Sequence, residues 1–262
     1  MKKHKIIVVV LIVGIIIAIL IGIPLTILEI NKKRERKCIL HAGGSIDGLT
    51  YLNLQESFLY YYEKGYRLFE YDFLLSNDGK LIGTHNYEGF EGFDLSNGIS
   101  YEEFNNFKIN GKYTPVNEEW LIDTIVKFPD VKIIIDTKSS YEEIYERLEN
   151  LNVDLKDNII PQIYSKEMWD FFKNGYEYKQ YIFSNYKENY SCDQILKYFD
   201  DERIFAITIP VWSSIELLRS IDEIKEKNKY VFIHTITTNF EYRIALFYGV
   251  DGIYVDNPFL FN

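Results

Sequence analysis

Residues 67–73 read Arg-Leu-Phe-Glu-Tyr-Asp-Phe, a short apolar run that carries two carboxylates. Side chains alternate between the two faces of a β-strand, so Glu70 and Asp72, two residues apart, point the same way. Two carboxylates side by side on a buried strand repel each other unless a cation or a proton lies between them. The stretch therefore predicts a buried strand with a cation-binding end.

Histidines close the apolar runs on either side of this stretch. Residues 38–41 end in His41 and residues 80–85 end in His85. Two imidazoles that flank a pair of carboxylates can supply an acid and a base near neutral pH. This combination suggests metal-assisted phosphodiester chemistry.

The rest of the chain alternates between continuous apolar runs and helical patterns with a spacing near 3.6. Such runs are typical of parallel strands that are covered on both faces. Strands are predicted at 39–41, 68–73, 81–85, 131–136, 159–163, 181–184, 204–209, 230–235 and 252–255, and helices at 54–64, 117–128, 141–151, 166–174, 192–199, 214–227 and 240–248. Residues 74–80, with the turn Asn77-Asp78-Gly79, are expected to form a hairpin-like elaboration after the second strand.

About eight such units in one uninterrupted segment predict a closed (β/α)₈ TIM barrel. The alternative is an open doubly wound sheet, which calls for a glycine-rich phosphate loop after the first strand. His41-Ala42-Gly43-Gly44 is too short for that fingerprint. The barrel is therefore the preferred fold, and its chemistry is expected where the strands end.

The amino terminus reads as a membrane anchor. Residues 6–28 are apolar and uncharged, long enough to cross a hydrocarbon core of about 30 Å. We therefore expect residues 1–37 to form one transmembrane helix with a basic linker, and residues 38–262 to form the barrel. Basic residues on both sides of the span mildly favour a cytoplasmic barrel. Because single amino-terminal anchors often export the domain that follows, we expect an extracytoplasmic location.

The charge of the barrel segment excludes some partners. Residues 1–37 hold 8 of the 29 Lys and Arg and 2 of the 39 Asp and Glu, which leaves a net charge of −16 on the remainder. Nucleic acid is not an expected partner, because phosphate contacts need clustered cations. Membrane contact is expected through the amino-terminal helix alone. The two cysteines, Cys38 and Cys192, give neither a disulfide framework nor zinc spacing.

A third carboxylate follows the same spacing rule. Asp136 and Lys138 share a face just beyond the apolar run 133–135. Together with Glu70 and Asp72, Asp136 makes a hard oxygen site suited to Mg²⁺ or Ca²⁺, and Lys138 is placed to hold a phosphate oxygen. The competing interpretation is that Lys138 neutralises these acids and no metal binds.

Other polar or aromatic residues at strand ends are candidates for a substrate pocket. They are Gln162, Tyr164, Trp212 and His234. Taken singly, His41 and His234 are more often packed barrel residues than catalysts, and His85 is more often a surface residue. Gly43 and Gly44 favour a functional role for His41, because glycine lets the backbone approach a ligand closely.

Several of these segments in order resemble the glycerophosphodiester phosphodiesterases of the phospholipase-C-like phosphodiesterase superfamily. That family shows a His-Arg-Gly start, an Asn in Glu-Asn-Thr, a Glu-x-Asp pair, an Asp-Gly turn, a His-Asp and a Glu-x-Lys. This chain has His41-Ala42-Gly43, Asn53, Glu70-Tyr71-Asp72, Asp78-Gly79, His85-Asn86, Asp136-Thr137-Lys138, His234-Thr235 and a final strand segment at 249–258.

The resemblance implies a (β/α)₈ fold, a divalent cation held by Glu70, Asp72 and Asp136, and His41 and His85 as the acid–base pair. Four positions depart from the family pattern: Ala42 replaces arginine, Leu52 an acidic residue, Asp136 a glutamate and Asn86 an aspartate. With Ala42 in place of arginine, Lys138 or Arg67 is expected to contact the phosphate.

The expected function is therefore hydrolysis of glycerophosphodiesters or related envelope and lipid head-group diesters by a membrane-anchored phosphodiesterase. Imidazole suits both proton-transfer roles. We favour His41 as the base and His85 as the acid, although the sequence does not fix the order. The alternatives are a phospholipase C or D type of lipid phosphodiesterase, and a degenerate barrel that binds glycerophosphate polymers. The choice of Mg²⁺ or Ca²⁺ and the oligomeric state stay open.

Overall fold

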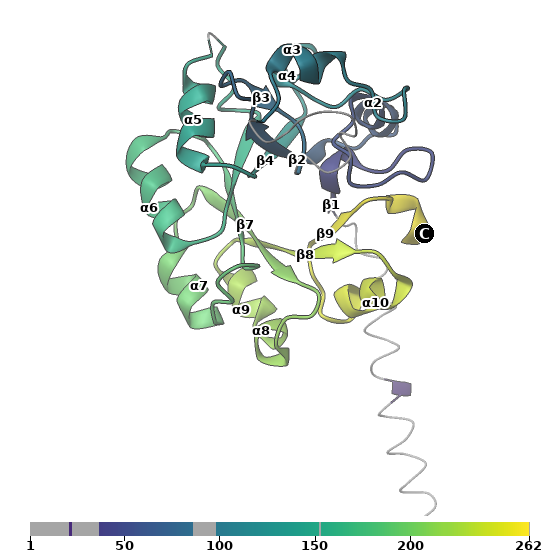
Figure 1. Cartoon of the computed structure of the whole chain (residues 1–262). Coiled ribbons are helices and arrows are strands. Elements are labelled where there is room, and N and C mark those ends of the chain that lie inside the picture. Colours follow the sequence, from purple (N-terminus) through teal and green to yellow (C-terminus); the bar gives the residue numbers. More distant parts are fainter. Residues whose placement is uncertain (1–20, 23–36, 86–97, 152, 262) are drawn as a thin grey trace, which may run out of the picture.

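The computed structural model describes residues 21–22, 37–85, 98–151 and 153–261 (Figure 1). The predicted membrane span at 6–28 lies outside the described residues apart from Ile21 and Gly22. In the part of the chain that is described, no helix is long and apolar enough to cross a membrane.

Parallel strands form a closed barrel, as the sequence predicts. Going round the barrel, the order is β1, β9, β8, β7, β6, β5, β4 and β2, and Leu40 of β1 pairs with Phe69 of β2 to close it. The strands are β1 Lys37–Leu40, β2 Leu68–Leu75, β4 Lys132–Thr137, β5 Ile159–Ile163, β6 Tyr181–Ser184, β7 Ile204–Pro210, β8 Tyr230–Ile236 and β9 Gly252–Val255. The predicted (β/α)₈ fold is therefore confirmed for the described residues.

Helices surround the barrel, and Figure 1 shows them ranged along its outside. They are α2 Gln55–Glu63, α3 Tyr101–Asn106, α4 Glu118–Lys127, α5 Tyr141–Glu149, α6 Lys166–Gly175, α7 Cys192–Tyr198, α8 Ile215–Arg219, α9 Ile221–Glu226 and α10 Asn239–Phe247. Serine, threonine or asparagine side chains cap many of them, such as Ser140 at the start of α5 and Ser214 at the start of α8.

Two local predictions need correction, and one short helix was not predicted. The predicted strand at 81–85 is only β3 Leu81–Ile82, which pairs antiparallel with the end of β2 and lies outside the parallel barrel. The predicted helix 214–227 is interrupted at Ser220, whose hydroxyl donates to the Glu216 carbonyl oxygen. Helix α3 was not expected, because its six residues are too few to show a clear apolar period.

Two apolar layers build the core. Residues that point into the barrel form the inner layer: Ile39, Ile134, Ile160, Ile182, Ala206, Phe232 and Tyr254. The alternate residues of the same strands pack outward against the helices. The site follows from this alternation, because the residue two positions beyond an inward apolar residue also points inward, nearer the carboxyl ends of the strands.

Candidate active site

Three buried carboxylates meet at the carboxyl end of the barrel. Glu70 and Asp72 lie on β2 and Asp136 lies on β4, where Asp136 is the register partner of Asp72. Each side chain is nearly inaccessible to solvent. One oxygen from each residue lies within 4.8 Å of the others, which is close enough for a single cation to contact all three. The structure thus brings together the three residues that the sequence singled out as metal ligands.

Lys138 lies directly beside this cluster. Its Nζ atom is 2.9 Å from Oδ1 of Asp72 and 2.5 Å from Oδ2 of Asp136. Burial lowers the pKa of Lys138, but the charges of Asp136 and Asp72 outweigh that effect and raise it above its ordinary value. The lysine is therefore charged and compensates part of the cluster.

Backbone and amide groups orient the carboxylates from the other side. The Ala42 backbone N–H donates to Oε2 of Glu70 at 2.8 Å. Asn53 donates from Nδ2 to Oδ2 of Asp72 at 3.0 Å, and its Oδ1 accepts from the Asp72 backbone N–H at 2.9 Å. These buried hydrogen bonds fix which oxygens remain directed at the shared space.

The charge balance of the cluster favours a further cation. Burial, and then the charge of Asp72, raise the pKa of Glu70 above its usual range against the opposing effect of His41. Burial also raises the pKa of Asp136, although Lys138 opposes the rise. Carboxylates whose charge is this unfavourable gain most from a bound cation, and three hard oxygen ligands suit Mg²⁺ or Ca²⁺. The residues present therefore fit a divalent ion.

His41 lies next to the cluster and is oriented by an acid. Its Nδ1 atom is 2.8 Å from Oδ1 of Asp256, so the ring directs its other nitrogen elsewhere. Burial lowers the pKa of His41, but the Asp256 hydrogen bond and the charges of Glu70, Asp256 and Asp72 raise it to about 9. A histidine with such a partner can hold or release a proton at Nε2 without reorienting.

His85 lies across the mouth from His41, with a tyrosine ring between them. The centroid of the Tyr51 ring is 4.7 Å from that of His41 and 5.0 Å from that of His85. Both histidines and Tyr51 line the same cavity. The two histidines that the sequence proposed as an acid–base pair therefore share one site.

This cavity has a volume of about 250 Å³, and its two sides differ in charge. On one side lie the acids, Lys138 and the two histidines, and on the other are neutral hydroxyl, amide and imidazole groups. The neutral side comprises Gln162, Tyr164, Ser184, Tyr186, Thr208, His234, Thr235 and Tyr254. Gln162 is fixed by Tyr164 at 2.5 Å and by the Tyr254 hydroxyl at 2.9 Å. Burial, and then the charge of His41, lower the pKa of His234 to about 4, so its imidazole is neutral.

Two predicted substrate contacts lie elsewhere. Arg67 precedes β2 at the amino end of the barrel, where its Nε donates to Asp130 at 2.5 Å. Because active-site groups collect at the opposite, carboxyl end, Arg67 does not reach the cavity. Trp212 is 66% exposed, and its ring stacks on that of Phe240 with a centroid distance of 6.0 Å. Trp212 is not among the residues that line the cavity.

Several lining residues were missed by sequence reasoning. Ser184, Thr208 and Tyr254 are inward-facing residues on β6, β7 and β9, and the alternation that predicts Asp136 also points to them. Asp256 follows β9 directly, but the sequence does not indicate that it pairs with His41. Tyr51 gave no signal, because it lies in an irregular loop far along the chain from His85.

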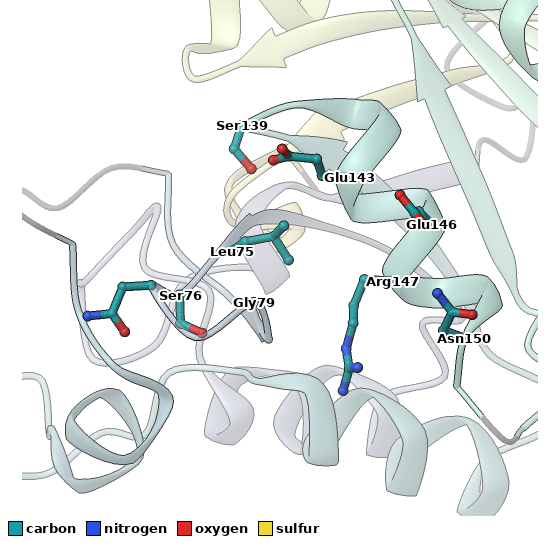
Figure 2. A pocket seen from close by; sticks show the side chains of 9 residues that line it. Leu75, Ser76, Gly79, Ser139, Glu143, Glu146, Arg147 and Asn150 are labelled. Carbon is teal, nitrogen blue, oxygen red and sulfur yellow. The ribbon is translucent and has the colours of Figure 1, made fainter.

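A second, shallower pocket of about 540 Å³ lies on the outside of the barrel (Figure 2). The turn that contains Ser76 and Gly79 forms one side, and residues of α5 form the other. Arg147 forms a bidentate ion pair with Glu118 there: Nε donates to Oε2 at 2.7 Å and Nη2 donates to Oε1 at 2.5 Å. None of the predicted site residues lies in it, so the barrel mouth is the candidate active site.

Fold and site together define a (β/α)₈ barrel with an acidic, histidine-flanked mouth. A scan against models of protein families gives no match for this chain, and a search of curated proteins gives none either. The similarity of this chain to known proteins is therefore found by comparing three-dimensional structures.

Solved structures similar to this chain include several glycerophosphodiester phosphodiesterases. The enzyme from Thermotoga maritima is 21% identical with a TM-score of 0.64, over 85% of this chain and 95% of that one. A glycerophosphoryl diester phosphodiesterase from Parabacteroides distasonis is 18% identical with a TM-score of 0.69, over 86% and 84%. A phosphodiesterase from Oleispira antarctica, in complex with the product sn-glycerol-3-phosphate, is 16% identical with a TM-score of 0.67, over 85% and 93%. At identities this low, the likeness establishes the fold, and it agrees with the resemblance expected from the motifs.

Proposed function

We propose that this chain is a metal-dependent phosphodiesterase that hydrolyses glycerophosphodiesters or related diesters of envelope and lipid head groups. One observation carries the proposal: three buried carboxylates with oxygens within 4.8 Å lie at the mouth of a barrel, beside a lysine and next to a cavity that two histidines also line. Structures with the same fold are phosphodiesterases, and one of them holds sn-glycerol-3-phosphate.

Each residue has a task that follows from charge. Glu70, Asp72 and Asp136 would hold a divalent cation, which neutralises the charge that builds on the non-bridging phosphate oxygens. Lys138, already charged beside them, would bind a phosphate oxygen by electrostatic attraction. One histidine removes a proton from water or from a neighbouring substrate hydroxyl, and the other protonates the leaving oxygen. Asp256 supports either role for His41, because it orients the ring and stabilises the imidazolium form.

The neutral side of the cavity is assigned to the alcohol part of the substrate. Gln162, Tyr164 and His234 lie there, and their donors and acceptors suit hydroxyl groups better than a positively charged head group. The assignment of the base to His41 and the acid to His85 remains a prediction. A pH–rate profile of the Asp256→Asn variant tests it, because only the limb that belongs to His41 shifts.

We also propose that residues 6–28 anchor the protein in a membrane and that the barrel lies outside the cytoplasm. The support comes from the uncharged length of this segment. Expression with a carboxyl-terminal reporter whose activity depends on its compartment tests the location. A cytoplasmic reporter signal would contradict the proposed location of the barrel. Release of the full chain by salt washing would contradict the membrane anchor.

A lipid-type substrate is the second candidate, and a surface feature favours it. Trp212, in the loop after β7, stacks on Phe240, at the start of helix α10 after β8, and the two side chains are 66% and 63% exposed. The strands β7 and β8 carry Thr208 and His234, which line the cavity. An apolar chain attached to the diester would bury part of this surface. Activity on lysophospholipids that exceeds activity on deacylated diesters, and that falls in Trp212→Ala, would favour this candidate.

The deciding experiment is a phosphodiesterase assay of the full chain in detergent, with a panel of glycerophosphodiesters and lysophospholipids. It includes added Mg²⁺ or Ca²⁺, EDTA, and the variants His41→Asn and Glu70→Gln. The matched control is Arg67→Met, which alters an arginine at the opposite end of the barrel. We expect metal-dependent turnover that is lost in the first two variants and kept in the control. Tight binding of glycerophosphate polymers without turnover would instead identify a binding barrel.

A further inference from the structure

Tyr51 occupies a position between the two histidines that the roles assigned above do not explain. Its ring contacts the imidazole of His41 at a centroid distance of 4.7 Å and that of His85 at 5.0 Å. The residue lines the cavity and is 37% exposed, so one side of it faces solvent. A buried structural role accounts poorly for a side chain that is open to this extent.

The backbone of Tyr51 is held in an unfavourable conformation. Its φ angle is +63°, in the left-handed region that glycine and asparagine adopt most readily. Such conformations persist when the surrounding structure enforces them, and they cluster at functional sites.

The loop is fixed on both sides of Tyr51. Before it, Asp47 forms an ion pair with Lys112 at 2.7 Å and accepts a hydrogen bond from the Tyr113 hydroxyl. After it, Asn53 is held by two hydrogen bonds to Asp72. The chain between these attachments places the Tyr51 ring over the mouth of the site.

We propose that Tyr51 is a positioning residue of the phosphodiester site, whose ring holds the imidazoles of His41 and His85 at a fixed separation across the cavity. The inference rests on the proposed function. With both imidazoles held apart, the acid and the base face a bound diester from two sides without first reorienting. Holding catalytic groups in the correct orientation toward the substrate increases the reaction rate of enzymes by large factors.

The test compares Tyr51→Gly with Tyr51→Phe, and uses Asn228→Gly as the matched control. Asn228 also has a positive φ, +57°, and it lies in the turn before β8 at the other end of the barrel. For Tyr51→Gly we expect kcat to fall by about tenfold to a hundredfold with a smaller change in KM. The melting temperature should be unchanged or higher, because glycine relieves the backbone strain. The imidazole NMR signals of His41 and His85 should both broaden or split, because each ring then samples more than one orientation; loss of the tyrosine ring alone would only move sharp signals.

Tyr51→Phe keeps the ring, so we expect its kcat and its imidazole signals to remain close to those of the parent protein. Asn228→Gly should leave kcat and both signals unchanged. An unchanged kcat in Tyr51→Gly, or a fall in kcat matched by a fall in melting temperature, would overturn the proposal. If the parent protein cleaves no diester, the proposed function fails. The imidazole signals and the melting temperature still decide whether Tyr51 positions the histidines.

Discussion

At the scale of single residues, His41 and Asp256 form a hydrogen-bonded pair whose contribution to stability depends on pH. In the folded protein the pKa of His41 is raised from 6.5 to about 9, since the hydrogen bond and nearby carboxylates outweigh the effect of burial. A group whose pKa is raised by folding stabilises the folded state fully below its unfolded pKa. That stabilisation is lost as the pH rises through the folded pKa.

We therefore expect Asp256→Asn to lower the pKa of His41 and to destabilise the metal-free protein most below pH 6.5. The loss should shrink as the pH rises through about 9, where the parent imidazole also loses its proton. Urea unfolding in EDTA across this range, with NMR titration of the imidazole, measures both effects. The control is Asp130→Asn, which removes an exposed partner of Arg67. An Asp256→Asn penalty that is constant with pH would contradict the assignment.

At the scale of secondary-structure elements, one ion pair joins three of them. Glu118 of α4 accepts two hydrogen bonds from Arg147 of α5, and its Oε2 also accepts from the Leu81 backbone N–H of β3 at 3.3 Å. Glu118 is only 6% exposed. Its charge is therefore tolerated because Arg147 covers it.

Arg147→Met should leave the Glu118 carboxylate buried and without its partner, and should lower the free energy of unfolding by about 2 kcal/mol. The expected loss in free energy of unfolding is smaller than is usual when a buried ion pair is broken, because Arg147 is partly exposed. Adding Glu118→Gln should recover part of the loss. Chemical denaturation measures the difference, and Lys166→Met serves as the control because both partners of its ion pair are half exposed. Equal losses in the two single variants would refute a special role for this pair.

Most elements are predictable from local sequence, and the exceptions have local causes. The barrel strands are continuous apolar runs, and capping residues such as Ser140 and Ser214 mark helix starts. The break at Ser220 escapes detection because the apolar spacing continues through it. Helix α3 escapes because it depends on its Ser100–Glu103 capping box and on packing against the β2–β3 hairpin.

At the scale of the whole molecule, closure of the barrel depends on a glycine. Gly252 begins β9 and pairs with Lys37 of β1. A Cβ atom at this position would lie 2.2 Å from Phe232 Cε1 and 2.6 Å from the Lys37 carbonyl oxygen. There is therefore no room for a side chain where the first and last strands meet.

Gly252→Ala should destabilise the protein by about 2 kcal/mol or more, since the ring of Phe232 and the β1 backbone must both move. Gly175→Ala is the control, because a Cβ atom there meets nothing within 4 Å, and it should be neutral or slightly stabilising. Thermal and urea unfolding compare the two. Similar stabilities for both variants would show that the closure tolerates a larger residue.

Cation binding is also a property of the whole molecule, because it links the three carboxylates to global stability. At a concentration of Ca²⁺ or Mg²⁺ about a hundred times its dissociation constant, the folded state should gain about 2.7 kcal/mol. The shift in melting temperature should disappear with EDTA and should be lost in Glu70→Gln. The Asp130→Asn variant should keep the shift. A full shift in Glu70→Gln would place the cation elsewhere on the acidic surface.

Local sequence patterns are enough to predict most of the strands, their inward faces and much of the site. Period-two alternation is a local property, and it places Asp72, Asp136, Gln162 and His234 two residues beyond inward-facing neighbours. Which of these groups come into contact depends on how the chain folds in three dimensions. Closure of the barrel brings Asp256 to His41 across 215 residues, and two fixed loop ends place Tyr51 between the histidines. The same closure puts Arg67 at the opposite end. Such contacts depend on register and loop geometry, which local sequence does not encode.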